Sequence, residues 1–388
     1  MNPGDANPVL AIDPSGHRSP AKADFDRDVH CLLGLPFDAV NMGDAIRIVR
    51  TAVAQRAACF ISTPNLNFLI GCRTDRQFRA SVINSDLSTA DGMPLVWIAR
   101  ILGIPIHERV PGAGLFEALR GNATQPLSVY FFGGPDGVAE TACQRLNTES
   151  SGIRCSGFAS PGFGSVHDMS GKATIAAINA SNADFLLVSL GAKKGQAWIE
   201  HNRTQISVPV ISHLGAVVNF VAGRLKRAPP WWQRSGLEWL WRIKEEPGLW
   251  RRYLADGLAL IRLLATLVIP HYWFIHRHPP TKLEVDSADI SMHQDANEMA
   301  ICLRGAWTQK NLRPLRDCFS TAVMAEKDLR VDMRHVSYVD TSFLGLLLLL
   351  YGHQIRHGRS LSCGPMNRQV RKLFVFGCCE FLLSADLP

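Results

Sequence analysis

Short apolar runs alternate with helical stretches between about residue 29 and residue 222. Four of these runs are candidate strands, and they occupy residues 57–62, 127–132, 185–190 and 208–212. Such alternation is typical of an α/β domain in which the sheet is mostly parallel. The pattern therefore predicts a Rossmann-like sheet domain over this part of the chain.

Loop-forming residues follow each candidate strand. The four loops begin with Thr63-Pro64-Asn65, Gly133-Gly134-Pro135, Gly191-Ala192 and His213-Leu214-Gly215. In an open α/β sheet the ligand crevice lies at the carboxyl ends of the strands. We therefore expect these four loops to line one pocket.

The stretch 224–277 reads as helices, and its most apolar part is 258–275. A helix that spans a membrane needs about 20 apolar residues. Because Arg262 interrupts the apolar run and Pro270 breaks it, we predict a helix that lies on the membrane surface. A helix that spans the membrane is the alternative.

A second alternation of strands and helices begins after about residue 283. Strands are predicted at 299–304 and 329–333, and helices at 310–325 and 343–357. About a hundred residues are enough for an independent small domain.

The polar N-terminus lacks the apolar core of a signal peptide, and we interpret it as a flexible tail. The predicted organisation is a tail at 1–28, the sheet domain at 29–222, a helical appendage at 223–277, a linker at 278–284 and a small α/β domain at 285–388.

Composition excludes several classes of protein and locates the charge. The 388 residues are 47% hydrophobic and 19% charged, which excludes a disordered, a collagen-like and a small disulfide-dense protein. Between Arg224 and Arg277 there are ten Lys and Arg residues against four acids, and six of the nine tryptophans. Tryptophan with arginine suits a lipid headgroup layer or a protein partner, and the arginines could also hold phosphates.

The cysteines and acidic pairs give no sign of a metal site. The ten cysteines include no CxxC pair, which argues against a zinc site and a disulfide framework, so we interpret them as buried thiols of a reducing cytoplasm. Two D-x-D strings, Asp24-Phe25-Asp26 and Asp26-Arg27-Asp28, lie in the predicted tail. We therefore predict no metal and no cofactor.

Four ordered motifs resemble those of the WecG/TagA/CpsF glycosyltransferases, glycosyltransferase family 26. They are Thr63-Pro64-Asn65, Ala90-Asp91-Gly92, Glu108-Arg109-Val110-Pro111-Gly112 and Gly236-Leu237-Glu238-Trp239-Leu240-Trp241-Arg242. The resemblance covers about residues 29 to 255. It implies transfer of an N-acetylmannosamine-type or related sugar from a UDP donor to a polyprenyl-diphosphate-linked sugar, at the cytoplasmic membrane face. In this family the products feed wall teichoic acid, enterobacterial common antigen, and capsular polysaccharide or exopolysaccharide.

Residues 283–388 are similar to a STAS domain, the fold of anti-sigma factor antagonists. The strongest local match is Val339-Asp340-Thr341-Ser342-Phe343-Leu344. The resemblance implies that Ser342 is a candidate phosphosite for a partner kinase and that the domain binds a protein partner. Phe343 stands where the family usually has glycine, which weakens the case for phosphoregulation but not for the fold.

Sugar transfer needs a base for the acceptor hydroxyl, and Asp91 is the candidate. It lies in a turn flanked by apolar residues, where partial burial would raise the pKa of its carboxyl group. The alternative is a turn-forming Asp-Gly whose carboxylate caps a helix that begins near Pro94. The resemblance favours the base, because this aspartate is the family's proposed base.

Thr63, Asn65 and Arg109 are candidate substrate-binding residues. Thr63 and Asn65 end a strand and could hydrogen-bond to sugar or uridine hydroxyls; otherwise they form an ordinary strand exit. Arg109 has the planar guanidinium that suits a pair of phosphates. Its alternative is an ion pair with Glu108 or with a nearby acid.

Two glycine-containing segments add weaker candidates. Gly133 and Gly134 permit close approach of a ligand to the backbone, but they lack G-x-G-x-x-G spacing, and no P-loop motif occurs in the chain. The family motif G-x-P-K-Q-E-x-W-I stands here at residues 191–199 with Lys193, Gly195 and Gln196 in place of its Pro, Gln and Glu. Gln196 could supply the amide from one position later. Alternatively, Lys193 and Lys194 face the diphosphate, or they are merely a solvated pair.

Four appendage arginines complete the candidate site: Arg227, Arg242, Arg251 and Arg252. The resemblance implies an appendage that closes over the site at the membrane and brings arginines to the diphosphate, which would also exclude water. The alternative is a basic surface that binds anionic lipid without a part in the chemistry.

These observations together predict an inverting, metal-independent glycosyltransferase, peripheral on the cytoplasmic membrane face, with no nucleic-acid partner. Asp91 would deprotonate the acceptor, and Arg109 with the appendage arginines would stabilise the departing UDP. The rival hypothesis is a regulatory protein that acts through STAS-mediated partner binding and has an inactive transferase domain. Intact Thr63, Asp91 and Arg109 favour the enzyme, whereas the replaced Gln and Glu favour the rival.

Overall fold

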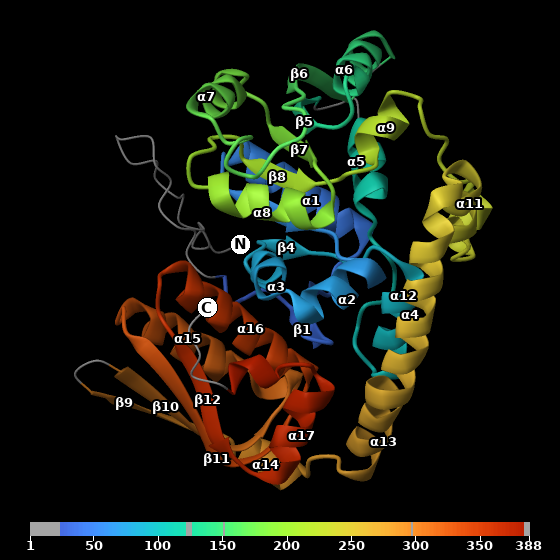
Figure 1. Ribbon diagram of the computed structural model, residues 1–388. Helices are drawn as coiled ribbons and strands as arrows, with labels where there is room; N and C mark the ends of the chain where they lie inside the picture. The colour runs from blue at the N-terminus through green and yellow to red at the C-terminus, as the bar shows by residue number, and fades with distance from the viewer. Residues whose placement is uncertain (1–23, 122–125, 150–151, 296–297, 384–388) are drawn as a thin grey trace, which may run out of the picture.

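The computed structural model of the protein describes residues 24–121, 126–149, 152–295 and 298–383. Figure 1 shows two α/β units and a helical arm that joins them. The N-terminal unit fills the upper half of the view, the arm runs in yellow along the right side, and the C-terminal unit lies in orange and red at the lower left.

A six-stranded parallel sheet forms the centre of the N-terminal unit, in the order β4-β3-β8-β7-β5-β6. Its strands are β3 (Cys59–Ser62), β4 (Leu87–Ser88), β5 (Leu127–Gly133), β6 (Ile153–Ala159), β7 (Phe185–Ser189) and β8 (Val210–His213). The predicted Rossmann-like sheet and its four predicted strands are confirmed. The sequence pattern missed β4, which has only two residues, and β6, an edge strand in which buried and exposed positions alternate at its start.

Helices cover both faces of this sheet because successive strand residues point to opposite sides. Phe131 and Leu187 pack among α1, α5, α6 and α9, whereas their neighbours Phe132 and Val188 pack against α7 and α8. The helices are α1 (Met42–Ala54), α2 (Leu66–Thr74), α3 (Arg76–Ile83), α4 (Met93–Ile101), α5 (Gly112–Arg120), α6 (Val138–Glu149), α7 (Lys172–Ala180), α8 (Ala192–Asn202) and α9 (Val217–Val221).

The arm is helical, as predicted for the appendage. It consists of α10 (Pro230–Arg234), α11 (Glu238–Glu245), η1 (Pro247–Leu249), α12 (Trp250–Leu263), a π-helical turn η2 (Leu264–Val268) and α13 (Ile269–Arg277). The prediction that Pro270 breaks the helix was wrong. Pro270 lies in the first turn of α13, directly after the π-helical turn, where the hydrogen-bonding pattern has already changed and the missing N–H is tolerated. Pro247–Arg277 is long and apolar enough to cross a membrane by length and composition.

The C-terminal unit has a four-stranded sheet in the order β12-β11-β10-β9, parallel except for β9. It contains α14 (Lys282–Asp286), β9 (Asp289–Gln294), β10 (Glu298–Trp307), η3 (Gln309–Asn311), α15 (Arg313–Met324), β11 (Asp328–Val339), α16 (Thr341–Arg356), β12 (Leu361–Met366), α17 (Arg368–Phe376) and η4 (Glu380–Leu382). Both predicted strands and both predicted helices are present. The predicted linker is partly helical, because Thr281 and Glu284 form a capping box that starts α14.

The end of the predicted tail is packed between the two units. Residues 1–23 lie outside the described part of the chain, but Phe25 is buried in the core of the C-terminal unit. Arg27 forms an ion pair with Asp38 at 2.7 Å and donates to the Ser85 carbonyl at 2.8 Å. The prediction of a tail was therefore wrong for residues 24–28, since a buried aromatic ring and a buried ion pair hold them.

A short antiparallel hairpin, β1 (Val29–Leu32) and β2 (Leu35–Asp38), continues from this segment. Strand β1 lies against α16, and a Cβ at Gly345 would come within 2.5 Å of the Val29 carbonyl oxygen. Val29 and Cys31 belong to the same apolar core as the residues of α16. The two units therefore share a continuous interface through the hairpin.

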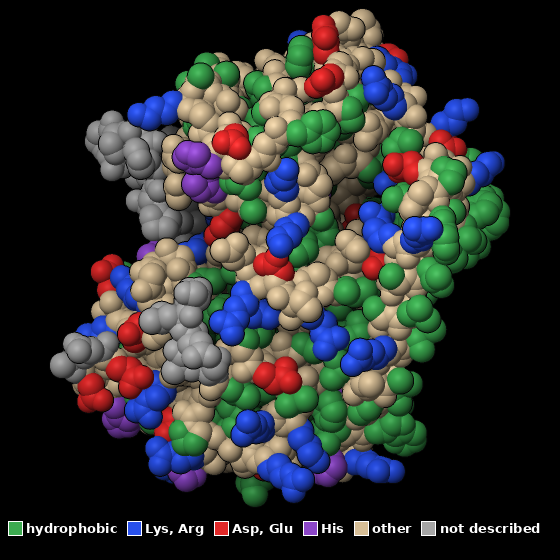
Figure 2. Space-filling view, in the orientation of Figure 1, with side chains coloured by type: hydrophobic (Ala, Val, Ile, Leu, Met, Phe, Trp, Pro, Cys, Tyr) green, Lys and Arg blue, Asp and Glu red, His purple; other side chains and the backbone are tan. Residues whose placement is uncertain are grey.

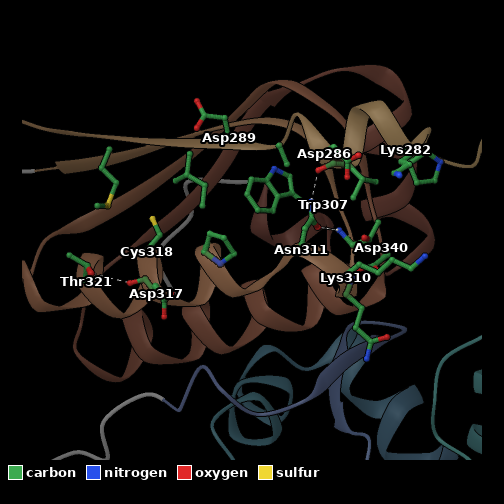
Figure 3. A pocket seen from close by; sticks show the side chains of 18 residues that line it. Lys282, Asp286, Asp289, Trp307, Lys310, Asn311, Asp317, Cys318, Thr321 and Asp340 are labelled. Carbon is green, nitrogen blue, oxygen red and sulfur yellow. Dashed lines mark hydrogen bonds between the residues drawn. The ribbon is translucent and has the colours of Figure 1, made fainter.

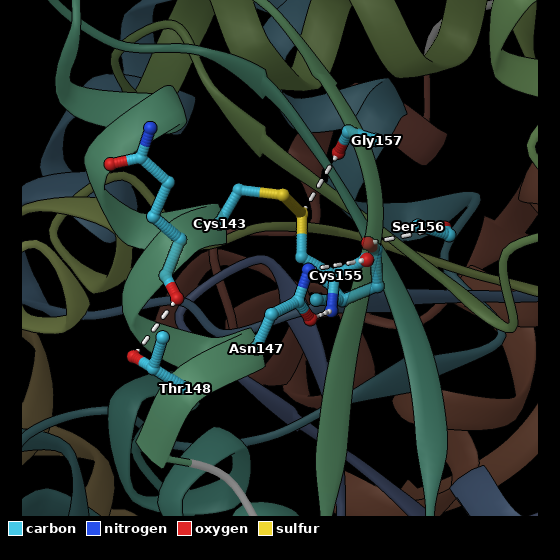
Figure 4. The surroundings of a disulfide bond; sticks show 8 residues. Cys143, Asn147, Thr148, Cys155, Ser156 and Gly157 are labelled. Atoms are coloured by element: carbon cyan, nitrogen blue, oxygen red, sulfur yellow. Dashed lines mark hydrogen bonds between the residues drawn. A yellow bond between two sulfur atoms is a disulfide. The ribbon is translucent and has the colours of Figure 1, made fainter.

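One pair of cysteines is bonded, which corrects the prediction of ten free buried thiols. Cys143 of α6 and Cys155 of β6 form a disulfide across a separation of 12 residues (Figure 4). Helix α6 returns alongside β6, and the Asn147 side chain accepts from the Cys155 N–H at 2.9 Å in the same place. No spacing motif announces this pair, because the folding back of the helix on the strand brings the two residues together.

Candidate active site

Asp91 lies in the loop between β4 and α4, at the carboxyl edge of the sheet. Its backbone N–H donates to the Pro64 carbonyl at 2.9 Å, which ties it to the loop after β3. Helix α4 begins after Gly92, and no side chain caps it. The alternative in which the Asp91 carboxylate merely caps this helix therefore does not match the structure.

The surroundings of the Asp91 carboxyl group raise its pKa to about 6. Burial is the main cause, and the charge of Glu238 adds to it. Arg109, the Gly112 N–H and Arg242 act in the opposite direction. A carboxyl group that titrates near neutral pH fits a general base.

Arg109 forms an ion pair with Glu238 at 2.7 Å. Arg109 precedes α5, and Glu238 is the first residue of α11, so this pair closes the arm over Asp91. The Glu108 carboxylate instead accepts from the Met42 N–H at 2.7 Å. Of the two alternatives predicted for Arg109, an ion pair with Glu108 or with a nearby acid, the structure therefore shows the second, with Glu238. Glu238 was not predicted as a site residue, although it lies within one of the four motifs.

Thr63 and Asn65 lie beside this group of charges. Thr63 is buried, and a Cβ at Gly112 would lie 3.1 Å from its Oγ1, so the glycine allows α5 to approach the strand end. The Asn65 side-chain oxygen accepts from the Phe68 N–H at 3.1 Å and caps α2. This cap uses only the carbonyl oxygen, so the amide nitrogen of Asn65 can serve a ligand.

Two of the four predicted arm arginines turn inward. The Nε atoms of Arg227 and Arg242 are both buried, and neither has a hydrogen-bond partner among the described residues. A Cβ at Gly114, two residues after Gly112, would lie 3.4 Å from Arg227 Nη2. Arg242 also pairs with Glu246 at 3.6 Å through Nη2, and its charge lowers the pKa of Asp91, so it lies near that carboxyl group. Buried guanidinium N–H groups without a partner are suited to an anionic ligand.

The other two arginines do not join the site in this structure. Arg251 and Arg252 are exposed, and their guanidinium groups lie 5.5 Å from the Trp250 ring and 5.2 Å from the Tyr253 ring. Their position on the outer side of α12 matches the predicted alternative of a basic surface.

Gly133 ends β5 and Gly134 follows it, with φ angles of +93° and +91°. The Gly134 N–H donates to the Ser189 carbonyl at 2.9 Å, and a Cβ at Gly133 would lie only 2.8 Å from the same oxygen. Glycine is therefore required where the ends of β5 and β7 meet. Contacts within the protein thus explain both glycines, and an approach of a ligand to their backbone stays a prediction.

The structure does not place Gln196 in the crevice. Gln196 is fully buried, and its Nε2 donates to Ser62 Oγ at 3.1 Å. Moving one position along a helix turns a side chain by about 100°, which here points it into the core. Lys193 pairs with Asp75, and Lys194 donates to the Gly164 carbonyl at 2.9 Å, so both ammonium groups have partners within the protein.

Ser342 is buried at the interface between the two units, with 2% of its surface exposed. Its hydroxyl lies 3.0 Å from Nδ1 of His30 on β1. Asp340 caps α16 in the same turn by accepting from the Phe343 N–H at 2.9 Å. A kinase could reach Ser342 only if β1 separated from α16.

A cleft of about 1250 Å³ lies in the C-terminal unit, between β9, the end of β10 and α15 (Figure 3). The cleft is lined by 18 residues between Pro280 and Asp340, including Trp307 and Lys310. None of the predicted transferase residues is among them. Among the described residues, no group of three His, Cys, Asp or Glu side chains could hold a metal ion.

Comparisons with known proteins identify both units. Residues 30–271 match the family described as glycosyl transferase WecG/TagA/CpsF, and residues 290–377 match the Mlab, STAS domain. The first match covers more than half of the chain.

Curated relatives match the transferase unit. A protein of Bacillus spizizenii is 29% identical over 57% of this chain and 86% of its own length. A protein of Bacillus subtilis is 26% identical over 52% and 78%, and one of Staphylococcus aureus is 24% identical over 57% and 85%. All three are named N-acetylglucosaminyldiphosphoundecaprenol N-acetyl-beta-D-mannosaminyltransferase.

The predicted α/β fold with a STAS-like domain agrees with these matches, and the predicted motifs lie in the matched segment. The chain therefore belongs to the WecG/TagA/CpsF glycosyltransferase family and carries a STAS domain after its helical arm.

Proposed function

We propose that the protein transfers an N-acetylmannosamine-type or related sugar, with inversion, from a UDP donor to a hydroxyl group of a polyprenyl-diphosphate-linked sugar. The observation that carries this proposal is the partly buried Asp91 carboxyl group, with a pKa of about 6, among Arg109, Arg242 and Glu238. The names of the relatives support the class of donor sugar and acceptor. The product would enter the biosynthesis of a cell-surface polymer or exopolysaccharide.

The geometry suggests the roles of the residues. Asp91 accepts the proton of the acceptor hydroxyl as its oxygen attacks the anomeric carbon. The bond from that carbon to the UDP oxygen breaks, and the phosphates take the electron pair. Arg109, Arg227 and Arg242 stabilise the negative charge that develops on UDP. Binding of the diphosphate would displace Glu238 from Arg109, since both anions need the same guanidinium group.

An apolar stripe on the arm supports a place on the membrane surface. The stripe consists of Trp250, Leu254, Leu258, Ile261, Ile269 and Trp273, which are all exposed. Their spacing of three, four and eight residues puts them on one helix face. Figure 2 shows apolar side chains with Lys and Arg between them along the right edge of the molecule, where this arm lies. We propose that this face rests in the headgroup layer of the cytoplasmic membrane leaflet.

Substitution of Leu258 by Gln tests the membrane contact. Leu258 is 61% exposed, and burying a leucine side chain in lipid contributes about 1.5–3 kcal/mol, so we expect at least about tenfold weaker binding to anionic phospholipid vesicles. Leu283→Gln is the matched control, because Leu283 is 77% exposed on α14 outside the stripe. Equal vesicle binding by wild type and Leu258→Gln, measured by flotation, would contradict this membrane face.

Substitution of Glu238 by Gln tests the electrostatics of the base. Activity requires ionised Asp91, so kcat/KM should rise with pH through the pKa of about 6. Glutamine removes a charge that raises this pKa and leaves Arg109, which lowers it. We therefore expect the acid limb of the pH profile to move to lower pH. Glu298→Gln, which breaks the 3.1 Å pair with Arg330 in the STAS domain, should leave the profile unchanged; an unmoved limb in Glu238→Gln would argue against this assignment.

Transfer by the purified full-length protein tests the proposed function directly. A panel of UDP-sugars is incubated with a short-chain polyprenyl-diphosphate-linked N-acetylglucosamine, and UDP release and product mass are measured. Product that depends on the acceptor supports the proposal. Folded protein that gives no product with any donor in the presence of lipid favours the rival hypothesis of a regulator that acts through its STAS domain. The observations that support this rival are the buried Gln196 and the glycine at position 195.

A further inference from the structure

His213 is a buried polar residue at the carboxyl end of β8 to which the mechanism above assigns no role. Its side chain is 8% exposed, and its Nε2 atom is buried without a hydrogen-bond partner among the described residues. An unsatisfied buried polar atom costs about 1–3 kcal/mol. A ligand that supplied the missing partner would recover that cost.

The imidazole ring fills a slot between α8 and α2. A Cβ at Gly195, in the first turn of α8, would overlap the ring, and one at Gly215 would lie 3.2 Å from Nε2. On the other side, the Phe68 ring of α2 has its centroid 6.3 Å from that of His213. The slot therefore exists because positions 195 and 215 have no side chain.

This slot adjoins the loop that holds Asp91. Phe68 lies in the first turn of α2, whose cap is Asn65, and the Asp91 N–H bonds to the Pro64 carbonyl next to that cap. Burial lowers the pKa of His213 to about 4, so the ring is neutral near pH 7 and can form a hydrogen bond without adding charge. A neutral ring suits an uncharged polar group better than a phosphate.

The side chains next to it cannot take this role. The Gln196 side chain is hydrogen-bonded to Ser62, and the Lys193 ammonium group is ion-paired with Asp75. Gly195, where the family motif has Gln, offers no side chain at all. We propose that the His213 imidazole hydrogen-bonds to a hydroxyl or amide group of the donor sugar and so determines which nucleotide sugar is accepted. This inference rests on the proposed function, and it deepens it by naming a specificity-determining residue.

His213→Phe is the main test, because phenylalanine keeps a ring in the slot and removes both nitrogens. In the full chain, we expect the KM for the accepted UDP-sugar to rise about tenfold, with kcat changed by less than about twofold. The affinity for UDP alone, measured by calorimetry, should not change. A double variant, His213→Gly with Gly195→Gln, restores an amide in the same space and should change the ratio of kcat/KM between donors with an N-acetyl group and donors with a hydroxyl group at C2.

The outcomes separate this inference from the proposed function. Unchanged KM and unchanged donor ratio in both variants would overturn the inference while wild-type transfer still supported the function. An equal loss of affinity for UDP and for the UDP-sugar would overturn it as well, because the contact would then be to the nucleotide. Wild-type protein that binds no UDP-sugar would overturn both.

A measurement on the wild type covers the case in which a variant fails to fold. With ¹⁵N-labelled histidine, the ring nitrogen signals of His213 should shift when the UDP-sugar is added and stay in place when UDP is added. Signals that shift with neither ligand would overturn the inference.

Discussion

Asp91→Asn should lower kcat by about 100- to 10,000-fold, which is the range that a general base contributes. Asparagine has nearly the same shape, and the backbone bond from residue 91 to the Pro64 carbonyl does not involve the side chain. The amide, however, cannot accept the proton of the acceptor hydroxyl. Because Arg109, Arg227 and Arg242 remain in place, we expect the affinity for UDP to stay within a few-fold of the wild-type value. Initial rates of acceptor-dependent UDP release and calorimetry with UDP would measure the two effects.

The pH dependence of the activity is a second test of the role of Asp91. Any residual activity of Asp91→Asn should lose the acid limb near pH 6, because no carboxyl group titrates at that position. Asp317→Asn, on the exposed surface of α15, is the control and should match the wild type. If Asp91→Asn retained full kcat with a normal acid limb, another group would have to be the base.

The fold was predictable where a strand is both buried and long enough to leave an apolar run. Strands β5 and β7 meet that condition, since nearly all of their residues are buried. Strand β4 does not, because two residues leave no pattern. The disulfide and the packing of Phe25 also had no local signal, since both depend on segments that meet only in the folded chain.

The site was predictable where a motif residue sits at a strand end. The structure brings Thr63 and Asp91 together with Arg109, as the strand-end argument expects. Glu238 was missed because its role depends on the arm folding back onto Arg109. Gln196 was misplaced because only the phase of α8 decides whether that side chain points to the crevice or to the core.

The STAS domain is joined to the transferase domain by the hairpin, and this has a consequence for the site. Asp38 of β2 accepts from the Ser88 N–H of β4 at 2.6 Å, and β4 leads directly to the Asp91 loop. On the other side of the hairpin, Val29 packs against Gly345 of α16. A disturbance at the α16 interface can therefore reach the strand that positions Asp91.

Ser342→Glu should disturb that interface and destabilise the protein by several kcal/mol. Ser342 is 2% exposed, and its hydroxyl bonds to His30. A glutamate there would place a charged and larger side chain in a buried site that fits a serine hydroxyl. We expect a lower urea midpoint by tryptophan fluorescence and, through β2 and β4, a loss of transferase activity. Ser342→Ala should cost only about 1 kcal/mol, the typical value of one hydrogen bond, and the exposed Thr321→Glu should cost less.

The same experiment bears on Ser342 as a phosphosite. A phosphate is larger than a carboxylate and carries more charge, so phosphorylation at this position would require β1 to leave α16 and would then hold the two apart. Phosphorylation would act as a switch that opens the interface and lowers activity. A Ser342→Glu protein with wild-type stability and activity would show that the interface tolerates the charge, and the coupling from α16 to Asp91 would then have to be abandoned.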